Sequence, residues 1–248
     1  MKVLVADKFE ESGLTGLKAL GCEVLFEPKL DGAALGARLA ESGADVLIVR
    51  STQVTAAEME QGKALALIIR AGAGVNTIDL EAASARAIAV SNCPGKNSIA
   101  VAELAWGLIL ALDRRIAEQT ADLKAGVWNK AEYGKAKGLA GQTLGVIGLG
   151  SIGREVVARA KAFAMPVIAW SRSLDEAGAQ ALGVARAASI HELALASDVV
   201  TVHLALDKET KGIVDAAFFG AMKPGSFFVN TSHGEVVDGA ALAAAVAE

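Results

Sequence analysis

The sequence is poor in several features, and each shortage narrows the kind of protein it encodes. Cysteine is scarce, since Cys22 and Cys93 are the only two in 248 residues. Two thiols make neither a disulfide framework nor a cysteine-based metal cluster, and free thiols suit a reducing cytoplasm. We therefore expect a cytoplasmic protein without a metal site.

Basic charge is not in excess, and long hydrophobic runs are missing. The formal net charge of -4 at pH 7 argues against nucleic acid or an anionic membrane as a partner. The most apolar segment, Ile99 to Asp113, is interrupted by Glu103 and is too short to span a bilayer, so it predicts a buried helix. The N-terminal MKVLVADKFEE lacks the pattern of a signal peptide, so we expect no secretion.

What the sequence does contain is typical of a folded α/β protein. Apolar residues make up 53% and charged residues 21%, and much of the apolar share is alanine, which favours helices. Short β-branched runs alternate with alanine-rich stretches that place apolar residues at helical spacing. Continuous apolar strands separated by helices predict parallel sheets that are covered on both faces.

This alternation occurs twice along the chain. The first series predicts strands at residues 2–6, 23–26, 45–49, 66–70 and 87–90. A long helical segment then runs from Asn97 past Arg115. The second series predicts strands at residues 144–148, 167–170, 198–204 and 226–232, with a weaker one near Val184. We therefore predict an α/β fold of two doubly wound parallel-sheet domains, residues 1–96 and residues 97–248.

The strongest single motif is LGVIGLGSIGREVV, at residues 144–157. Gly148, Gly150 and Gly153 form the pattern G-x-G-x-x-G between an apolar strand and a helix. The first glycine permits a tight turn, the second lets phosphate oxygens approach the backbone, and the third lets the helix pack close to the strand. The motif predicts that the pyrophosphate of a dinucleotide binds at the helix N-terminus.

The residues after the next strand bear on the choice of dinucleotide. An acid usually binds the adenosine ribose of NAD at that place. Here Ser171, Arg172 and Ser173 follow the strand, with no acid before Asp175. A hydroxyl beside a guanidinium suits the 2′-phosphate of NADP, which a carboxylate would repel. The sequence thus predicts NAD(P), with NADP slightly favoured; the alternative is an exposed Arg172 that contacts no ligand.

Motifs spread over the whole chain carry a family resemblance. They are VRSTQVT (49–55), RAGAGVNTIDL (70–80), NCPGKNSIAVAELAWGLILALDRRI (92–116), LKAGVWN, the glycine turn, SDVVTVHLAL (197–206) and MKPGSFFVNTSHGEVVD (222–238). With these motifs the chain resembles the D-isomer-specific 2-hydroxyacid dehydrogenases, and among them the oxidoreductases that act on 3-phosphoglycerate in serine biosynthesis. The resemblance implies a flavodoxin-like substrate domain, a Rossmann domain that binds NAD(P), and a 2-hydroxy or 2-keto acid bound between them. It also implies a homodimer formed through the helical segment around Glu103 to Arg115.

The resemblance assigns site residues as well. It implies that Arg50 and Ser51 contact a phosphorylated hydroxy acid, and that the backbone of Ala73 and Gly74 receives the carboxylate. The alternative for Arg50 is an ordinary surface arginine, and the alternative for Ala73 and Gly74 is a plain strand-to-helix turn. The resemblance also adds cofactor-binding residues to the glycines, Ser171 and Arg172. These are Ser151, Ile152, Leu204, Ala205, Thr231, Ser232 and His233.

Two departures from the family pattern bear on catalysis. Hydride transfer at a hydroxy acid needs a cation near the carboxylate and carbonyl, together with an acid–base group. The family supplies the cation from an arginine, whereas this sequence has His233 at that place. Histidine is mostly neutral at pH 7 and cannot form the paired hydrogen bonds of arginine, a loss of roughly 1.5–3 kcal/mol. His233 is thus a weak catalytic candidate or an ordinary loop histidine.

The second departure is that the sequence ends at DGAALAAAVAE. The family continues with a strand, a glutamate, a histidine and a helix that returns to the first domain, so we expect a Rossmann domain without its last strands. His191 and His203 are better explained as structural histidines than as replacements for the family's catalytic histidine. Two functions remain open: an NAD(P)-dependent oxidoreductase whose catalytic pair lies beyond Glu248, and a catalytically silent NAD(P)-binding module or truncated gene product.

Overall fold

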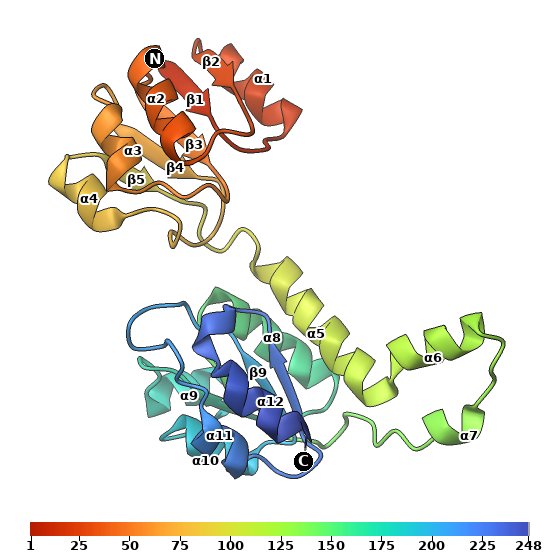
Figure 1. The fold of residues 1–248 in the computed structure, drawn as a ribbon. Coiled ribbons are helices and arrows are strands. Elements are labelled where there is room, and N and C mark those ends of the chain that lie inside the picture. Colours follow the sequence, from red (N-terminus) through yellow and green to blue (C-terminus); the bar gives the residue numbers. More distant parts are fainter. Residues whose placement is uncertain (248) are drawn as a thin grey trace. The chain divides into compact units, whose positions relative to one another are not determined.

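The computed structural model describes residues 1–247, and the chain forms two compact units that divide between Asn97 and Ser98 (Figure 1). Each unit contains one five-stranded sheet in which all paired strands are parallel. The prediction of an α/β protein with two parallel sheets is therefore confirmed.

The first unit has the strand order β2-β1-β3-β4-β5. Its strands are β1 (Lys2–Val5), β2 (Glu23–Phe26), β3 (Val46–Val49), β4 (Leu67–Arg70) and β5 (Ala89–Ser91). Its helices are α1 (Glu11–Ala19), α2 (Gly32–Ser42), α3 (Ala56–Gln61) and α4 (Leu80–Ala85). This is the flavodoxin-like order, which places a switch point between β1 and β3.

Alternation along the strands lets the first sheet pack against helices on both faces. Leu4 of β1 belongs to the core formed with α2, α3 and α4, whereas Val3 and Val5 belong to a core that includes Leu14 of α1. Successive side chains of a strand point to opposite faces, so one apolar run serves both cores.

The second unit has the strand order β10-β9-β6-β7-β8. Its strands are β6 (Leu144–Ile147), β7 (Val167–Trp170), β8 (Ala185–Arg186), β9 (Val199–Val202) and β10 (Phe227–Asn230). Its helices are α5 (Ser98–Arg114), α6 (Ile116–Lys124), α7 (Lys130–Tyr133), α8 (Ser151–Ala162), α9 (Glu176–Leu182), α10 (Ile190–Ala196), α11 (Ala216–Ala221) and α12 (Gly239–Ala247), with the short 3-10 helix η1 (Gly234–Val236). When its strands are counted from β6, the order is the 3-2-1-4-5 arrangement of dinucleotide-binding sheets.

The second sheet is also covered on both faces. Residues of α5 and α8 pack on one face together with Val146 of β6, and residues of α10, α11 and α12 pack on the other face together with Ile147. No helix within residues 1–247 is both long enough and apolar enough to cross a membrane.

Two predicted boundaries are wrong for a local backbone reason. The helical segment expected to run from Asn97 past Arg115 is interrupted at Arg115, whose φ of 50° is left-handed, and α6 starts as a separate helix. The strand predicted at residues 87–90 begins only at Ala89, because Ala87 has a φ of 55°. Neither conformation is readable from residue type, since non-glycine residues seldom adopt it.

Candidate functional site

The glycine turn lies at the carboxyl end of β6, the strand at which the order of the second sheet reverses. Gly148 has a φ of 96°, and a Cβ there would lie 2.7 Å from the carbonyl oxygen of His203. A Cβ on Gly153 would clash with the carbonyl oxygen of Gly148. A Cβ on Gly150, by contrast, would meet no atom within 4 Å, so open space lies in front of this residue. Gly148 and Gly153 thus allow the turn, and Gly150 leaves room for a ligand.

The N-terminus of α8 is prepared to bind an anion. Gly150 is its N-cap residue, no side chain caps it, and its first turn, which contains Ser151 and Ile152, has no acidic residue. The first N–H groups of a helix lack intrahelical acceptors and carry partial positive charge. The residues present therefore fit the pyrophosphate of a dinucleotide.

Buried contacts hold α8 and the turn in place. The Trp106 indole nitrogen of α5 donates to the carbonyl oxygen of Val156 at 3.2 Å. The Trp106 ring stacks on Phe163, with 4.5 Å between ring centroids. The amide of Gly148 donates to the carbonyl oxygen of Trp170, at the end of β7, at 2.8 Å. The turn is therefore tied to the neighbouring strand and to α5.

Asn230, at the end of β10, organises the loop that contains Thr231, Ser232 and His233. Its side-chain Oδ1 accepts from the backbone N–H of Ser232 at 2.9 Å and from the Ser232 hydroxyl at 2.7 Å, and its Nδ2 donates to the carbonyl oxygen of His233 at 2.9 Å. Asn230 was not among the predicted site residues, although an asparagine at a strand end is a typical turn residue. The His233 side chain is half-buried.

His203 connects this loop to β9. Its ring is buried, with Nε2 2.9 Å from the Thr201 hydroxyl and Nδ1 3.4 Å from the Thr231 hydroxyl. Burial lowers the pKa of His203 to about 4, so the ring is neutral at pH 7. The next two residues, Leu204 and Ala205, are half-buried and exposed respectively, at the carboxyl edge of the sheet.

Arg172 is exposed beyond β7, but it is not without contacts. Its Nη1 lies 2.5 Å from Glu209 Oε2, and its Nη2 lies 3.0 Å from Asp207 Oδ2. Both acids belong to the loop after β9 and were not among the predicted site residues. The sequence does show two acids shortly after a strand end. Arg172, however, lies 35 residues before Asp207 and 37 residues before Glu209, so the pattern could not reveal that they pair.

In the first unit, Arg50 and Ser51 follow β3 in a loop that Asp7 holds. Asp7 Oδ2 accepts from the backbone N–H groups of Arg50, Ser51 and Thr52 at 2.7, 2.9 and 2.9 Å. Partial burial acts to raise the pKa of Asp7, but these backbone hydrogen bonds outweigh it and hold the pKa below its usual value. Asp7 stays ionised and fixes the loop.

Arg70, at the end of β4, joins that loop to the one containing Ala73 and Gly74. Its Nε donates to the carbonyl oxygen of Arg50 at 3.1 Å, and its Nη1 donates to that of Gly74 at 3.0 Å. Asn92 Nδ2 donates to the carbonyl oxygen of Ala73 at 2.6 Å. The amide N–H groups of Ala73 and Gly74 have no acceptor within residues 1–247, so they are free to bind a carboxylate.

The structure thus gathers the predicted residues into two groups. Arg50, Ser51, Ala73 and Gly74 meet at the carboxyl edge of the first sheet, and the predicted cofactor residues meet at the carboxyl edge of the second. The parts of the chain that the structure describes contain no group of three or more His, Cys, Asp or Glu side chains that could hold a metal ion.

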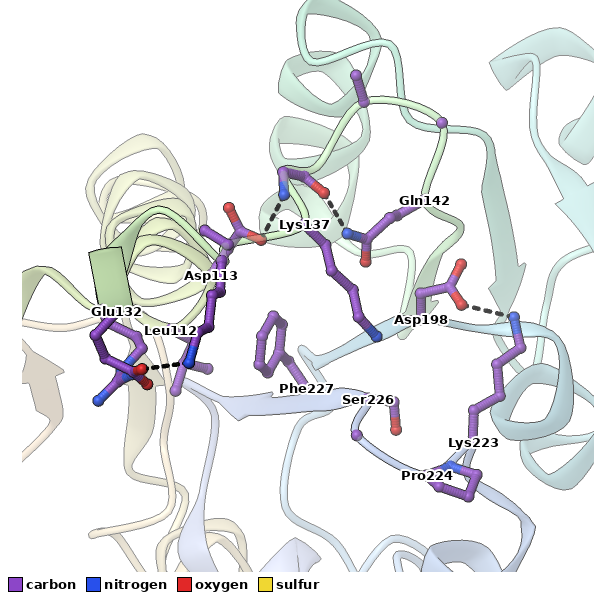
Figure 2. A pocket seen from close by; sticks show the side chains of 17 residues that line it. Leu112, Asp113, Glu132, Lys137, Gln142, Asp198, Lys223, Pro224, Ser226 and Phe227 are labelled. Carbon is purple, nitrogen blue, oxygen red and sulfur yellow. Dashed lines mark hydrogen bonds and ion pairs between the residues drawn. The ribbon is translucent and has the colours of Figure 1, made fainter. Parts of the chain in front are cut away.

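A cavity of about 660 Å³ opens at the opposite, amino edge of the second sheet, where β6, β9 and β10 begin (Figure 2). Figure 2 shows Lys137 extending toward Asp198, which pairs with Lys223 at 2.8 Å. Because ligands of open α/β sheets bind at the carboxyl edge, this cavity is not the dinucleotide site.

Comparison with known families agrees with this geometry. Residues 106–248 match the family model described as "D-isomer specific 2-hydroxyacid dehydrogenase, NAD binding domain". The chain belongs to the D-isomer-specific 2-hydroxyacid dehydrogenase family. The second unit is therefore an NAD(P)-binding domain, and the glycine turn lies within the matched residues.

Relatives of this chain extend the match to its first unit. A D-3-phosphoglycerate dehydrogenase of Methanocaldococcus jannaschii is 40% identical over 249 residues, which cover 100% of this chain and 47% of the relative. A hydroxypyruvate reductase of Thermotoga maritima is 43% identical over 199 residues, 80% of this chain and 63% of the relative. The chain spans about half the length of the D-3-phosphoglycerate dehydrogenases that it matches.

Solved structures show the same fold. The TT0316 protein of Thermus thermophilus has a TM-score of 0.88 and 34% identity, with coverage of 100% of this chain and 78% of the other. The holo form of D-mandelate dehydrogenase from Rhodotorula graminis has a TM-score of 0.89 and 29% identity, with coverage of 99% and 77%.

Proposed function

We propose that this chain forms the substrate-binding and nucleotide-binding part of an NAD(P)-dependent D-2-hydroxyacid dehydrogenase that acts on 3-phosphoglycerate. The observation that carries the proposal is the glycine turn at the switch point of the second sheet, followed by an uncapped α8 N-terminus. The identity to D-3-phosphoglycerate dehydrogenase of M. jannaschii, 40% over the full chain, supports the choice of substrate.

In this proposal the first unit binds the substrate and the second unit binds the dinucleotide. In the first unit, residues 1–97, the free N–H groups of Ala73 and Gly74 bind the substrate carboxylate, and the Arg50 guanidinium binds its phosphate. In the second unit, the N-terminus of α8 would hold the dinucleotide pyrophosphate, and the loop of Thr231, Ser232 and His233 would contact the nicotinamide end. The bound nicotinamide supplies hydride exchange at the hydroxyl-bearing carbon.

A hollow of about 850 Å³ in the first unit lies beside Ser51 and is lined in part by Asp7, Asp31 and Glu58. Carboxylates repel a phosphate, so this hollow does not suit the phosphate end of the substrate. The phosphate contact is therefore assigned to Arg50, which is exposed at the end of β3.

Calorimetric titration of the purified chain with NADH and NADPH tests the nucleotide part of the proposal. We expect saturable binding of at least one nucleotide. Oxidation of NADH in the presence of hydroxypyruvate phosphate, followed by absorbance on the full-length protein that contains this chain, tests the substrate. Binding without turnover of this or any other 2-keto acid would contradict the enzyme proposal.

A second function, a silent NAD(P)-binding module, is favoured by His233 at the place where the family has arginine. His233→Arg separates the two. If the site is catalytic, restoring the paired hydrogen bonds should raise kcat/KM for the keto acid by about ten- to a hundredfold. A silent module would bind NADH as before and would remain inactive in both forms.

We also infer a homodimer formed through α5, α6 and α7. Three leucines on one face of α5, Leu104, Leu108 and Leu112, are 57%, 40% and 42% exposed. Large apolar side chains continue the exposed surface beyond α5, and these are Ile116, Leu123, Val127 and Trp128. A second copy of the chain presents the same row of leucines and can cover it across a two-fold axis. A cytoplasmic location remains a prediction from composition.

The slight preference for NADP drawn from Ser171 and Arg172 has no support in the structure. Two carboxylates already bind the guanidinium of Arg172, and their negative charge would repel a 2′-phosphate.

A further inference from the structure

Arg172 lies at the end of the site where the adenosine of a dinucleotide binds. It follows β7, the neighbour of β6 in the sheet, and Trp170 at the end of β7 accepts a hydrogen bond from Gly148 of the glycine turn. In dinucleotide-binding sheets the residue just beyond this strand reads the 2′ position of the adenosine ribose. The groups around Arg172 therefore lie at the place where NAD and NADP differ.

Hydrogen bonds within its own loop position Asp207 against Arg172. Its Oδ1 accepts from the backbone N–H groups of Glu209 at 2.9 Å and Thr210 at 2.8 Å. The Thr210 hydroxyl accepts from the backbone N–H of Asp207 at 2.8 Å and donates to the carbonyl oxygen of Ala205 at 2.6 Å, and Thr210 is only 2% exposed. With Oδ1 bound to its own loop, Asp207 presents Oδ2 to Arg172.

Glu209 completes the contact from the same loop. It approaches Nη1 of Arg172 while Asp207 approaches Nη2, so the two outer nitrogens of the guanidinium each have a carboxylate partner. These ion pairs raise the pKa of Arg172, with the hydrogen bond to Glu209 contributing most. A 2′-phosphate that approached Arg172 would meet two carboxylates and would have to displace them.

We propose that Asp207 and Glu209 are the specificity-determining residues of the nucleotide site: by binding Arg172 they exclude a 2′-phosphate and select NAD over NADP. This inference rests on the proposed nucleotide-binding function of the glycine turn and deepens it. An acid from the loop after β9 takes the place of the acid that is missing after β7.

Titration of NADH and NADPH into the wild-type chain and its variants tests the proposal. The wild type should bind NADH at least about tenfold more tightly than NADPH. A difference of this size is what one charge-assisted hydrogen bond contributes. The double variant Asp207→Asn and Glu209→Gln frees the guanidinium and keeps a side-chain oxygen at position 207 available to the turn. It should bind NADPH about tenfold more tightly than the wild type does.

One further variant assigns the gain in NADPH affinity to Arg172, and two others are controls. Adding Arg172→Ala to the double variant should abolish the gain in NADPH affinity. Lys208→Gln tests the exposed lysine between the two acids and should leave the discrimination unchanged. Glu118→Gln, on α6, is the charge control and should have no effect. Circular dichroism and thermal unfolding establish that each variant is folded.

The outcomes are distinguishable. Equal binding of NADH and NADPH by the wild type, or no gain in NADPH affinity in the folded double variant, would overturn the assignment of Asp207 and Glu209 alone. Failure of the folded wild type to bind either nucleotide would overturn the proposed function together with this inference.

Discussion

Among single residues, Gly153 has the strictest requirement, because any Cβ there would clash with the carbonyl oxygen of Gly148. We predict that Gly153→Ala forces the turn away from α8, lowers the free energy of unfolding by about 1–3 kcal/mol and weakens NADH binding at least about tenfold. Gly220→Ala in α11, where a Cβ meets no atom within 4 Å, is the matched control and should bind NADH normally. Denaturant unfolding and calorimetric titration measure the two effects. Unchanged NADH affinity in Gly153→Ala would contradict the role of the turn.

His203 makes stability depend on pH in a defined window. Its folded-state pKa of about 4 lies below the ordinary value of 6.5, so the unfolded chain takes up the proton first as pH falls. The stabilisation is complete above pH 6.5 and is lost between pH 6.5 and pH 4, by at most about 3 kcal/mol. Urea unfolding across this range should show the loss in the wild type.

His203→Gln provides the comparison for that measurement. The variant has no titrating ring, so the decline between pH 6.5 and pH 4 should shrink whatever its starting stability. His191→Gln is the control, since the His191 side chain is 46% exposed. The carboxylates whose pKa values are lowered, such as Asp7 and Asp198, lose their stabilisation at lower pH, as they become protonated. An equal decline in wild type and His203→Gln would show that the ring does not cause it.

Among the elements, α5 serves two surfaces at once. One face, with Ala105, Trp106 and Ile109, is buried against α8 and the second sheet, and the other exposes the leucine row defined above. Figure 1 shows α6 and α7 extending away from the sheet of the second unit beyond the end of α5. A helix that is apolar on both sides needs a partner on each.

We predict that Leu108→Glu yields a monomer at concentrations where the wild type is a dimer, because it places a charge within the leucine row. Sedimentation equilibrium measures the change. Leu20→Glu, at an 81% exposed position just beyond α1, is the control and should leave the association unchanged. A wild type that is monomeric at all accessible concentrations would contradict the dimer, as would a Leu108→Glu variant that remains dimeric.

Element types followed closely from the sequence, whereas their ends did not. Apolar runs such as VIAW predict strands, and β7 covers the predicted residues 167–170. The termination of α5 depended on the left-handed backbone of Arg115, for which a non-glycine residue gives no signal.

For the whole molecule, the division into two units means that each has its own core. We predict that NADH at about a hundred times its Kd stabilises the second unit by about 2.7 kcal/mol, because the ligand binds only the folded state. Hydrogen exchange should slow in α8 and at the carboxyl ends of β6, β7 and β9. Protection confined to residues 1–97 would contradict the assigned site.

The sequence by itself determined the two α/β units, the glycine turn and the residues at strand ends, because hydrophobic periodicity and glycine spacing are local properties of the chain. The tertiary structure decided which charges meet. Asp7 reaches the loop of Arg50 across 43 residues, and Arg172 reaches Asp207 across 35. Parallel strands bring such distant residues to one sheet edge, and no local pattern records the orientation of their side chains, so the partners of Arg172 emerged only from the folded chain.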